Sequence, residues 1–105
     1  MQPLARTATL PDLQRYVADM EKQRGFTDRT VLDQCLMLGE EVGELFKAVR
    51  KNQQLPIGTT SIVGSVDEEL ADILIFLCAV ANRYGIDLGD ALCRKEEHNE
   101  QRTWR

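Results

Sequence analysis

Apolar residues recur three and four positions apart in four separate stretches of the chain, which places them on one face of an α-helix. The first predicted helix covers residues 11–24 and stops at Gly25, because proline suits a first helical turn and glycine commonly follows a last one. The second is expected to start after Thr27 or Asp28, which are both good capping residues, and to end near residue 52. The first half of the chain is therefore predicted to be helical apart from short connections.

The third predicted helix differs from the others because residues 73–81 are apolar on every side. Ser65 is expected to cap its start, with Glu68 in the capping-box position, and Gly85 is expected to end it. A helix that is apolar all round is buried all round. We expect a neighbouring subunit to supply part of that cover. A fourth helix is predicted to follow the capping residue Asp87.

The length of 105 residues suits one domain with one hydrophobic core. Residues 1–9 are expected to form a flexible leader, and residues 53–64, which are rich in glycine, serine and threonine, are expected to form a loop. Aromatic residues make up only 6% of the chain, which argues against a large β core. The predicted fold is therefore all-α, a single four-helix bundle over residues 1–105 that is completed by oligomerisation.

Charge and hydropathy exclude two classes of partner. The formal net charge of -4 at pH 7 is the opposite of the basic surface that binds nucleic-acid polymers. The apolar run 73–81 is much shorter than the roughly 20 residues needed to span a bilayer. Cys35, Cys78 and Cys93 lie in apolar helical contexts without metal-binding spacing, so we expect them to be reduced and buried. These features predict a cytoplasmic protein.

Two acidic clusters lie on the second and third predicted helices. Glu41 and Glu44 are three residues apart and share a helix face, whereas Glu40 points away from Glu41. Glu69 and Asp72 have the same spacing at the start of the buried helix. If the two faces meet, four carboxylates converge and raise each other's pKa unless a cation binds them. Hard oxygen ligands suit Mg²⁺, with Mn²⁺ as a substitute, and Mg²⁺ commonly takes phosphate oxygens as further ligands.

Two other interpretations of these acidic residues compete with a magnesium site. Acidic helix faces are often simply solvated and form local pairs, such as Glu44 with Lys47. A di-iron site in a helix bundle requires two Glu-x-x-His pairs, and the only histidine of this chain, His98, has Lys95 three residues before it. The di-iron site is therefore excluded, and the solvated face stays open as an alternative.

The acidic residues match a known pattern when they are taken together with the C-terminal tail. Residues 40–44 read Glu-Glu-Val-Gly-Glu, residues 69–72 read Glu-Leu-Ala-Asp, and residues 95–102 follow the pattern Lys-x-x-x-Asn-x-x-Arg. This combination resembles the MazG-like nucleotide pyrophosphohydrolases, which belong to the all-α NTP pyrophosphatase superfamily. The similarity extends over roughly residues 10–105. The dimeric dUTPases are relatives of this family.

The resemblance implies a Mg²⁺-dependent enzyme that cleaves a ribo- or deoxyribonucleoside triphosphate between the α and β phosphates, giving a monophosphate and pyrophosphate. It also implies a homodimer or homotetramer and a house-cleaning role in the nucleotide pool. The implied metal ligands are Glu41, Glu44, Glu69 and Asp72. The implied catalytic carboxylates are Glu40, Glu41 and Glu44, with Glu40 orienting a water or supporting the ligands. The implied substrate-binding residues are Lys47, Lys95, Asn99, Arg102 and Trp104.

Two alternatives to this function stay open at this point. In the first, the chain is a non-enzymatic helical module that dimerises through the third helix, and its acidic residues serve solubility. In the second, the chain is an enzyme of the dUTPase branch with a preference for uracil nucleotides. Stabilisation by Mg²⁺ separates the first alternative from the enzyme, because only converging carboxylates gain from a cation.

Overall fold

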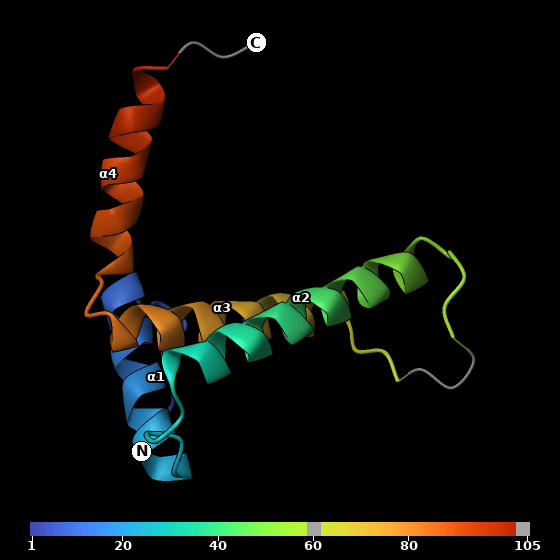
Figure 1. Cartoon of the computed structure of the whole chain (residues 1–105), viewed down its shortest axis with the longest axis horizontal. Coiled ribbons are helices and arrows are strands. Elements are labelled where there is room, and N and C mark those ends of the chain that lie inside the picture. The colour runs from blue at the N-terminus through green and yellow to red at the C-terminus, as the bar shows by residue number, and fades with distance from the viewer. Residues whose placement is uncertain (59–61, 103–105) are drawn as a thin grey trace.

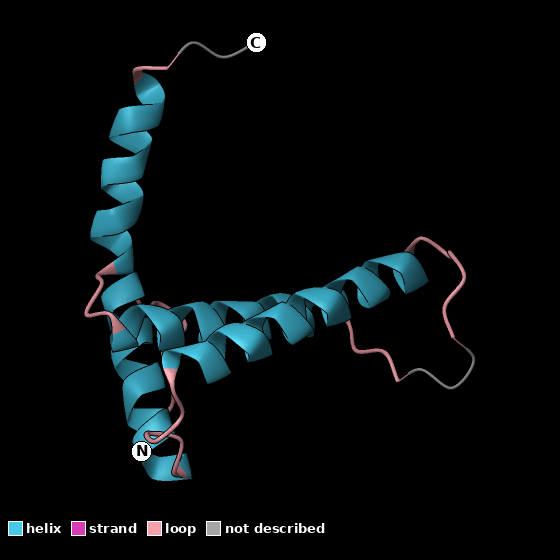
Figure 2. Cartoon of the chain, viewed as in Figure 1, coloured by secondary structure: helices cyan, strands magenta, loops and turns pink. Residues whose placement is uncertain are grey.

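The computed structural model describes residues 1–58 and 62–102, and over these residues it consists of four helices joined by loops (Figure 1). In chain order the helices are α1 (Leu10–Arg24), α2 (Val31–Asn52), α3 (Val66–Arg83) and α4 (Leu88–Glu100). Figure 2 shows no strand among the described residues. The prediction of an all-α chain with four helices is confirmed, while completion of the fold by oligomerisation stays a prediction.

Local hydrogen bonds fix where the first two helices begin. In α1 the Thr9 side chain accepts a hydrogen bond from the Asp12 backbone N–H, and the Asp12 carboxylate accepts one from the Thr9 backbone N–H. Thr30 and Asp33 form the same capping box at the start of α2. The prediction that Thr27 or Asp28 caps the second helix is therefore wrong, because only Thr30 has an acidic partner three residues later.

The start of α3 agrees with the sequence in position but not in its hydrogen bonds. Ser65 is the N-cap residue, as predicted, but its side chain forms no capping hydrogen bond. The Ser65 side chain instead bonds the Asp67 carboxylate, which lowers the pKa of that carboxyl. The predicted capping box with Glu68 is therefore wrong. Three acidic residues in the first turn still favour this helix end, where the helix dipole is positive.

Helix α3 is the element on which the others are assembled. It lies beside α2 along much of its length, and α1 crosses its C-terminal half (Figure 1). Helix α4 packs against α1 at its start and then projects away from the α2–α3 pair (Figure 1). The hydrophobic core lies where α1 crosses α3. Its buried members are Val17, Met20, Cys78 and Ala79, with the partly buried Leu13, Tyr16, Phe26, Ile75 and Leu88 packed around them.

A network around Gln14 joins the start of α4 to α1 and α3. The buried Gln14 amide donates hydrogen bonds to the Asn82 side chain and to the Ile86 carbonyl oxygen, at 3.1 and 2.8 Å. Its Oε1 accepts one from the Leu88 backbone N–H at 2.9 Å. The Asn82 amide in turn donates to the Gln14 carbonyl oxygen. This network ties the direction of α4 to α1, because the bonds hold both the connection and the first residue of α4.

A second polar cluster is centred on Arg83 at the C-terminal end of α3. Its guanidinium forms a bidentate ion pair with the buried Glu21 carboxylate, with the shorter contact at 2.7 Å. It also donates to the carbonyl oxygens of Phe26 and Arg29, at 3.2 and 3.0 Å. Both carbonyls belong to the connection between α1 and α2. Arg83 therefore fixes the path of that connection relative to α3.

The apolar side chains of α2 are divided between an inward and an outward face. The buried residues of this helix are Gln34 and Ala48, and Leu38, Val42 and Leu45 are partly buried. Cys35, Phe46 and Val49 are exposed, because α2 packs mainly on α3. The prediction that all three cysteines are buried is wrong, since Cys35 and Cys93 are exposed and only Cys78 is buried.

Exposed leucines continue this outward apolar surface along α2 and α3. Leu36 is 61% exposed and Leu32 is 66% exposed on α2, and Leu70, Leu74 and Leu77 are exposed on α3. The expectation that a neighbouring subunit covers α3 stays a prediction. Within the part of the chain that the structure describes, no helix combines the length and the apolar character needed to cross a bilayer.

Candidate metal centre

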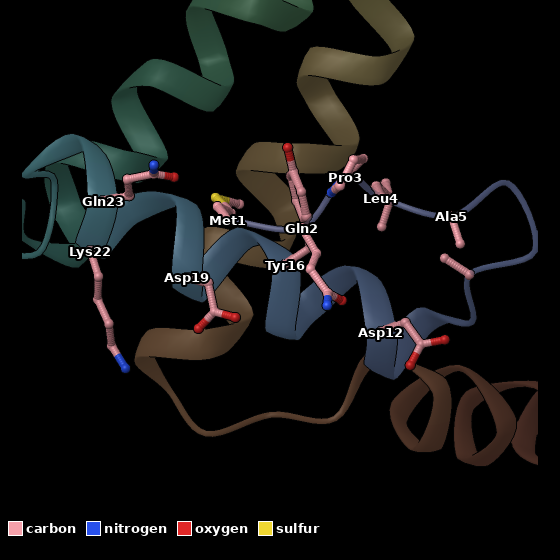
Figure 3. Close-up of a pocket in the computed structure, with 11 residues that line it drawn as sticks. Met1, Gln2, Pro3, Leu4, Ala5, Asp12, Tyr16, Asp19, Lys22 and Gln23 are labelled. Carbon is pink, nitrogen blue, oxygen red and sulfur yellow. The ribbon is translucent and has the colours of Figure 1, made fainter.

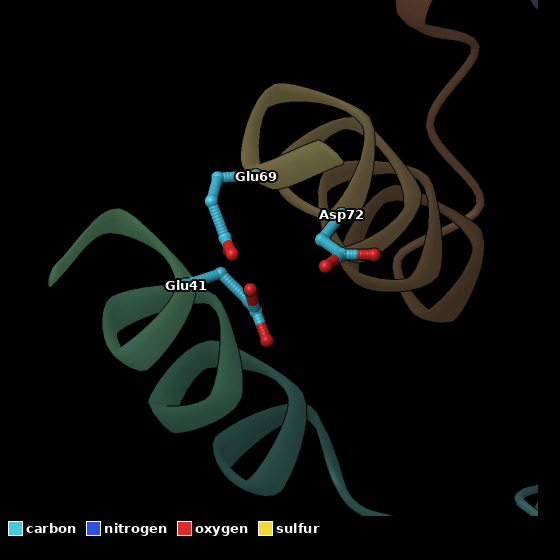
Figure 4. A group of neighbouring side chains, drawn as sticks. All are labelled: Glu41, Glu69 and Asp72. Carbon is cyan, nitrogen blue, oxygen red and sulfur yellow. The ribbon is translucent and has the colours of Figure 1, made fainter. Parts of the chain in front are cut away.

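Three carboxylates from two helices converge at the contact between α2 and α3. Glu41 projects from α2, and Glu69 and Asp72 project from α3 toward it (Figure 4). One oxygen of each carboxylate lies within 4.8 Å of the others. Glu69 is only 8% exposed, so the cluster lies at the edge of the helix contact rather than on an open surface. Glu69 and Asp72, which are three residues apart, therefore share one face of α3, as their spacing predicts.

The backbone at Gly64 approaches the Glu69 carboxylate closely. A Cβ atom at position 64 would overlap Glu69 Oε1, so a larger residue there would require the carboxylate to move. The Glu69 backbone N–H is held by the Ser65 carbonyl oxygen at 3.1 Å, as part of the first turn of α3. Gly64 thus brings the end of the α2–α3 connection into direct contact with the acidic cluster.

The electrostatics of the cluster favour a cation. Burial is the largest cause that raises the pKa of Glu41 to about 7, and a hydrogen bond shared with Glu69 and the nearby charges of Asp72, Glu69 and Glu44 add to it. A divalent cation would remove the repulsion between these oxygens and would compensate for the water contacts that they lose on burial. The donor set, which consists of carboxylate oxygens from rigid helices, is of the kind that binds Mg²⁺ or Mn²⁺.

The other carboxylates of the first motif lie around this cluster. Glu44 is near enough to Glu41 to raise its pKa, but it is not one of the three converging carboxylates. Its Oε1 instead lies 3.6 Å from Lys47 Nζ, and both side chains are partly exposed. Glu40 is exposed, as expected from its direction on the helix. The structure therefore brings together three of the four metal ligands predicted from the sequence.

The predicted substrate-binding residues of the tail lie on a different arm of the chain. Lys95 and Asn99 belong to α4, and Arg102 follows it, on the helix that projects away from α2 and α3 (Figure 1). Trp104 lies outside the described residues. Within one chain, these residues are not placed at the acidic cluster.

Two of the cavities near α1 differ in character. The larger, of about 830 Å³, lies between the N-terminal residues and α1, and residues such as Tyr16 and Asp19 line it (Figure 3). None of the three clustered carboxylates lines it. A smaller cavity, of about 150 Å³, is enclosed by α1, α2, α3 and the α1–α2 connection, and Asp72 forms part of its wall.

Gln34 is the residue of this smaller cavity that sequence reasoning missed. A glutamine on a helix is normally solvated, so its residue type alone does not predict burial. A signal was present, however, because Gln34 lies seven residues before Glu41 and hence two turns along the same face of α2. That face packs against α3, which accounts for the burial of a polar residue at this position.

Raising the pH is expected to destabilise the metal-free protein between about pH 5 and 7. The native Glu41 carboxyl keeps its proton up to a pKa of about 7, whereas in the unfolded chain it loses that proton near its usual 4.5. The unfolded state therefore binds fewer protons in this window, and the free energy of unfolding falls as the pH rises. We expect a loss of about 1–2 kcal/mol, or roughly 5–10 °C in Tm, measured by thermal denaturation in chelator.

Mg²⁺ should remove this pH dependence, because it binds the ionised carboxylates of the native state. The stabilisation by Mg²⁺ should therefore grow from pH 5 to 7. The matched control is Glu41→Gln, which is neutral throughout and should show neither the loss nor most of the metal response. A Tm that is constant over this window in wild-type protein, with and without Mg²⁺, would contradict the convergence of the carboxylates.

Comparison with known proteins identifies a family for this chain. The family model described as the MazG nucleotide pyrophosphohydrolase domain matches residues 20–104. A dATP/dGTP diphosphohydrolase of Salmonella phage PMBT28 is 33% identical over 98 residues. That alignment covers 93% of this chain, and the chain spans 29% of the length of the phage protein.

Solved structures of similar fold lead to the same family. Two crystal structures of iMazG from Vibrio DAT 722, which carry an N-terminal and a C-terminal tag, each match with a TM-score of 0.64 at 31% identity. The match to the structure with the N-terminal tag covers 93% of this chain and 100% of that chain. The match to the structure with the C-terminal tag covers 89% of this chain and 99% of that chain. On the family match over most of its length and this agreement in fold, the chain belongs to the MazG nucleotide pyrophosphohydrolase family, whose members are hydrolases acting on phosphoric anhydrides.

Proposed function

We propose that this chain hydrolyses nucleoside triphosphates between the α and β phosphates, with Mg²⁺ held by Glu41, Glu69 and Asp72. The observation that carries the proposal is the convergence of these three carboxylates within 4.8 Å. When bound, Mg²⁺ neutralises charge on phosphate oxygens and makes a bound water more acidic. Mn²⁺ offers the same chemistry with similar ligands. The products are a nucleoside monophosphate and pyrophosphate.

The remaining residues of the first motif would serve the reaction around the metal. Glu44 is proposed as a fourth ligand, since it is already near Glu41 and would exchange its contact with Lys47 for the metal. Lys47 would then be available to a phosphate oxygen. A carboxylate of the motif, Glu40, Glu41 or Glu44, accepts the proton of the attacking water. These roles follow the pattern of the family and are proposals for this chain.

We propose that the site is completed in a homodimer or homotetramer. The exposed apolar residues of α2 and α3, among them Leu36 and Phe46, offer a surface for a second copy. The projecting α4 of one chain would then bring its tail to the acidic cluster of another. The tail residues proposed to bind phosphate, sugar or base in this way are Lys95, Asn99, Arg102 and Trp104.

The name of the phage relative gives a first substrate class to test. That protein is named a dATP/dGTP diphosphohydrolase, and we propose that purine deoxynucleoside triphosphates are among the substrates of this chain. A house-cleaning role in the cytoplasmic nucleotide pool is part of the same proposal. The acidic net charge of -4 agrees with a free nucleotide, rather than a nucleic-acid polymer, as the partner.

Product analysis tests the proposed reaction directly. The protein is incubated with each common ribo- and deoxyribonucleoside triphosphate, with Mg²⁺ or with chelator, and the products are separated by anion-exchange chromatography. We expect monophosphate and pyrophosphate in equal amounts, only with the metal present. Release of orthophosphate and diphosphate would contradict cleavage between the α and β phosphates. Strict selectivity for uracil nucleotides would move the chain to the dUTPase branch.

A further inference from the structure

The small cavity beside Asp72 has the size and lining of a site for a flat aromatic ring. Its volume is about 150 Å³, the size of an apolar cavity that accommodates benzene. Half of its lining residues are apolar and come from α1, the α1–α2 connection and α3, namely Met20, Phe26, Ile75, Phe76 and Ala79. Asp72 belongs both to this wall and to the acidic cluster. A molecule with a charged end and an aromatic end would therefore bind with its charged end at the acidic cluster and its aromatic end in the adjoining cavity.

Gln34 supplies a buried hydrogen-bonding group to this wall, which also contains the charged residues Glu21, Arg24 and Arg29. Its side chain is 1% exposed, and its Oε1 has no hydrogen-bond partner among the described residues. A buried acceptor without a partner costs about 1–3 kcal/mol, so its presence requires an explanation. The contrast with Gln14 is informative, because the Oε1 and Nε2 atoms of that other buried glutamine both form hydrogen bonds. Gln14 holds the fold together, whereas Gln34 offers an acceptor that the fold does not use.

Two arginines contact the Phe26 part of the wall. Arg83 donates a hydrogen bond to the Phe26 carbonyl oxygen, and the Arg29 guanidinium stacks over the Phe26 ring at 3.8 Å from its centroid. The ion pair of Arg83 with Glu21 anchors this arrangement to α1. The cavity is thus preformed, which lowers the entropic cost of placing a ring in it.

We propose that this cavity receives the base of the nucleotide and that Gln34 determines its specificity by accepting a hydrogen bond from the exocyclic amino group of adenine. A carboxamide suits adenine because its oxygen accepts from the amino group while its nitrogen donates to a ring nitrogen. The proposal rests on the proposed function, since it assigns the base of the substrate whose phosphates meet the acidic cluster. A base without the amino group leaves the buried acceptor unpaired and binds less well.

The test compares two substrates that differ only in the amino group. These are dATP and the deoxynucleoside triphosphate of unsubstituted purine. For wild-type protein we expect kcat/KM to be about 10- to 100-fold higher for dATP. For Gln34→Leu we expect the ratio to fall to about 1, because leucine has a similar volume and no acceptor. The matched control is Gln23→Leu, which changes an exposed glutamine on α1 and should keep the wild-type ratio.

A stability measurement separates this role from a structural one. Gln34→Leu should keep or raise the Tm, because it removes an unpaired buried acceptor. Gln34→Met, which keeps the side-chain length, replaces it if the leucine variant loses helix content. A wild-type ratio near 1, or a ratio in the folded variant equal to that of wild type, would overturn the proposal.

Binding of the monophosphates distinguishes failure of this inference from failure of the proposed function. The affinities of dAMP and of the corresponding purine monophosphate are measured by calorimetry, which requires no turnover. If no triphosphate is hydrolysed, the proposed reaction fails, yet a dAMP preference that Gln34→Leu abolishes still supports the base site. Equal affinities in wild-type protein overturn the base site whatever the outcome for hydrolysis.

Discussion

Glu41→Gln is expected to lower kcat/KM for nucleoside triphosphates by about 10³-fold or more, while the helix content stays unchanged. The glutamine keeps the shape of the side chain but removes a charge from the centre of the three-carboxylate cluster. Metal binding weakens, and with it the stabilisation of charge on the phosphates. Initial rates at saturating Mg²⁺, together with circular dichroism, measure the two effects.

The same variant should have a higher Tm than wild type in chelator near pH 8. Ionised Glu41 is held in an unfavourable place by burial and by its acidic neighbours, and the substitution removes that cost. Activity and stability therefore change in opposite directions, which a merely damaged protein would not show. Glu68→Gln, at the exposed position next to Glu69, is the control and should affect neither strongly. Wild-type turnover in Glu41→Gln would remove this residue from the metal site.

Arg83→Met is expected to produce the largest loss of stability of any single substitution considered for this chain. It leaves the Glu21 carboxylate buried without its partner and frees two carbonyl oxygens of the α1–α2 connection. Breaking a buried pair from one side costs about 3–5 kcal/mol, which corresponds to a fall in Tm of at least about 10 °C. Chemical denaturation monitored by circular dichroism measures the change.

A second substitution should recover part of this loss. In Arg83→Met with Glu21→Leu no charge is left unpaired in the interior, so the double variant should be more stable than Arg83→Met alone. Arg15→Met breaks the exposed pair with Asp12 and is the matched control, for which we expect little change in Tm. A double variant as unstable as Arg83→Met would assign the loss to the carbonyl hydrogen bonds instead of the ion pair.

Much of the fold could be predicted because helix ends are marked by local chemistry. Gly25 ends α1 because a residue without a Cβ tolerates its φ of 74°, and Asp87 begins α4 because its side chain accepts a hydrogen bond from a backbone N–H. The start of α2 was misplaced because several suitable capping residues precede it. The choice of Thr30 depends on its reciprocal hydrogen bonds with Asp33, which the capping preference of a single residue type does not reveal.

The acidic cluster could be predicted because a helix fixes the directions of residues three apart. The helical spacing of Glu69 and Asp72 and the contact between α2 and α3 are enough to bring both carboxylates close to Glu41. The position of Glu44 depends on its side-chain rotamer and on the competing Lys47, neither of which a spacing rule contains. Gln34 was missed for a related reason, since its burial follows from how closely α2 and α3 pack and not from its residue type.

The projecting α4 has a consequence for how the molecule behaves in solution. The Cα radius of gyration is 16.3 Å, whereas a compact chain of this length has one of about 13 Å. A single chain therefore diffuses more slowly and scatters X-rays like a larger particle, and column calibration against globular standards would overstate its mass. Light scattering, which gives mass without reference to shape, is the appropriate way to count the subunits of this protein.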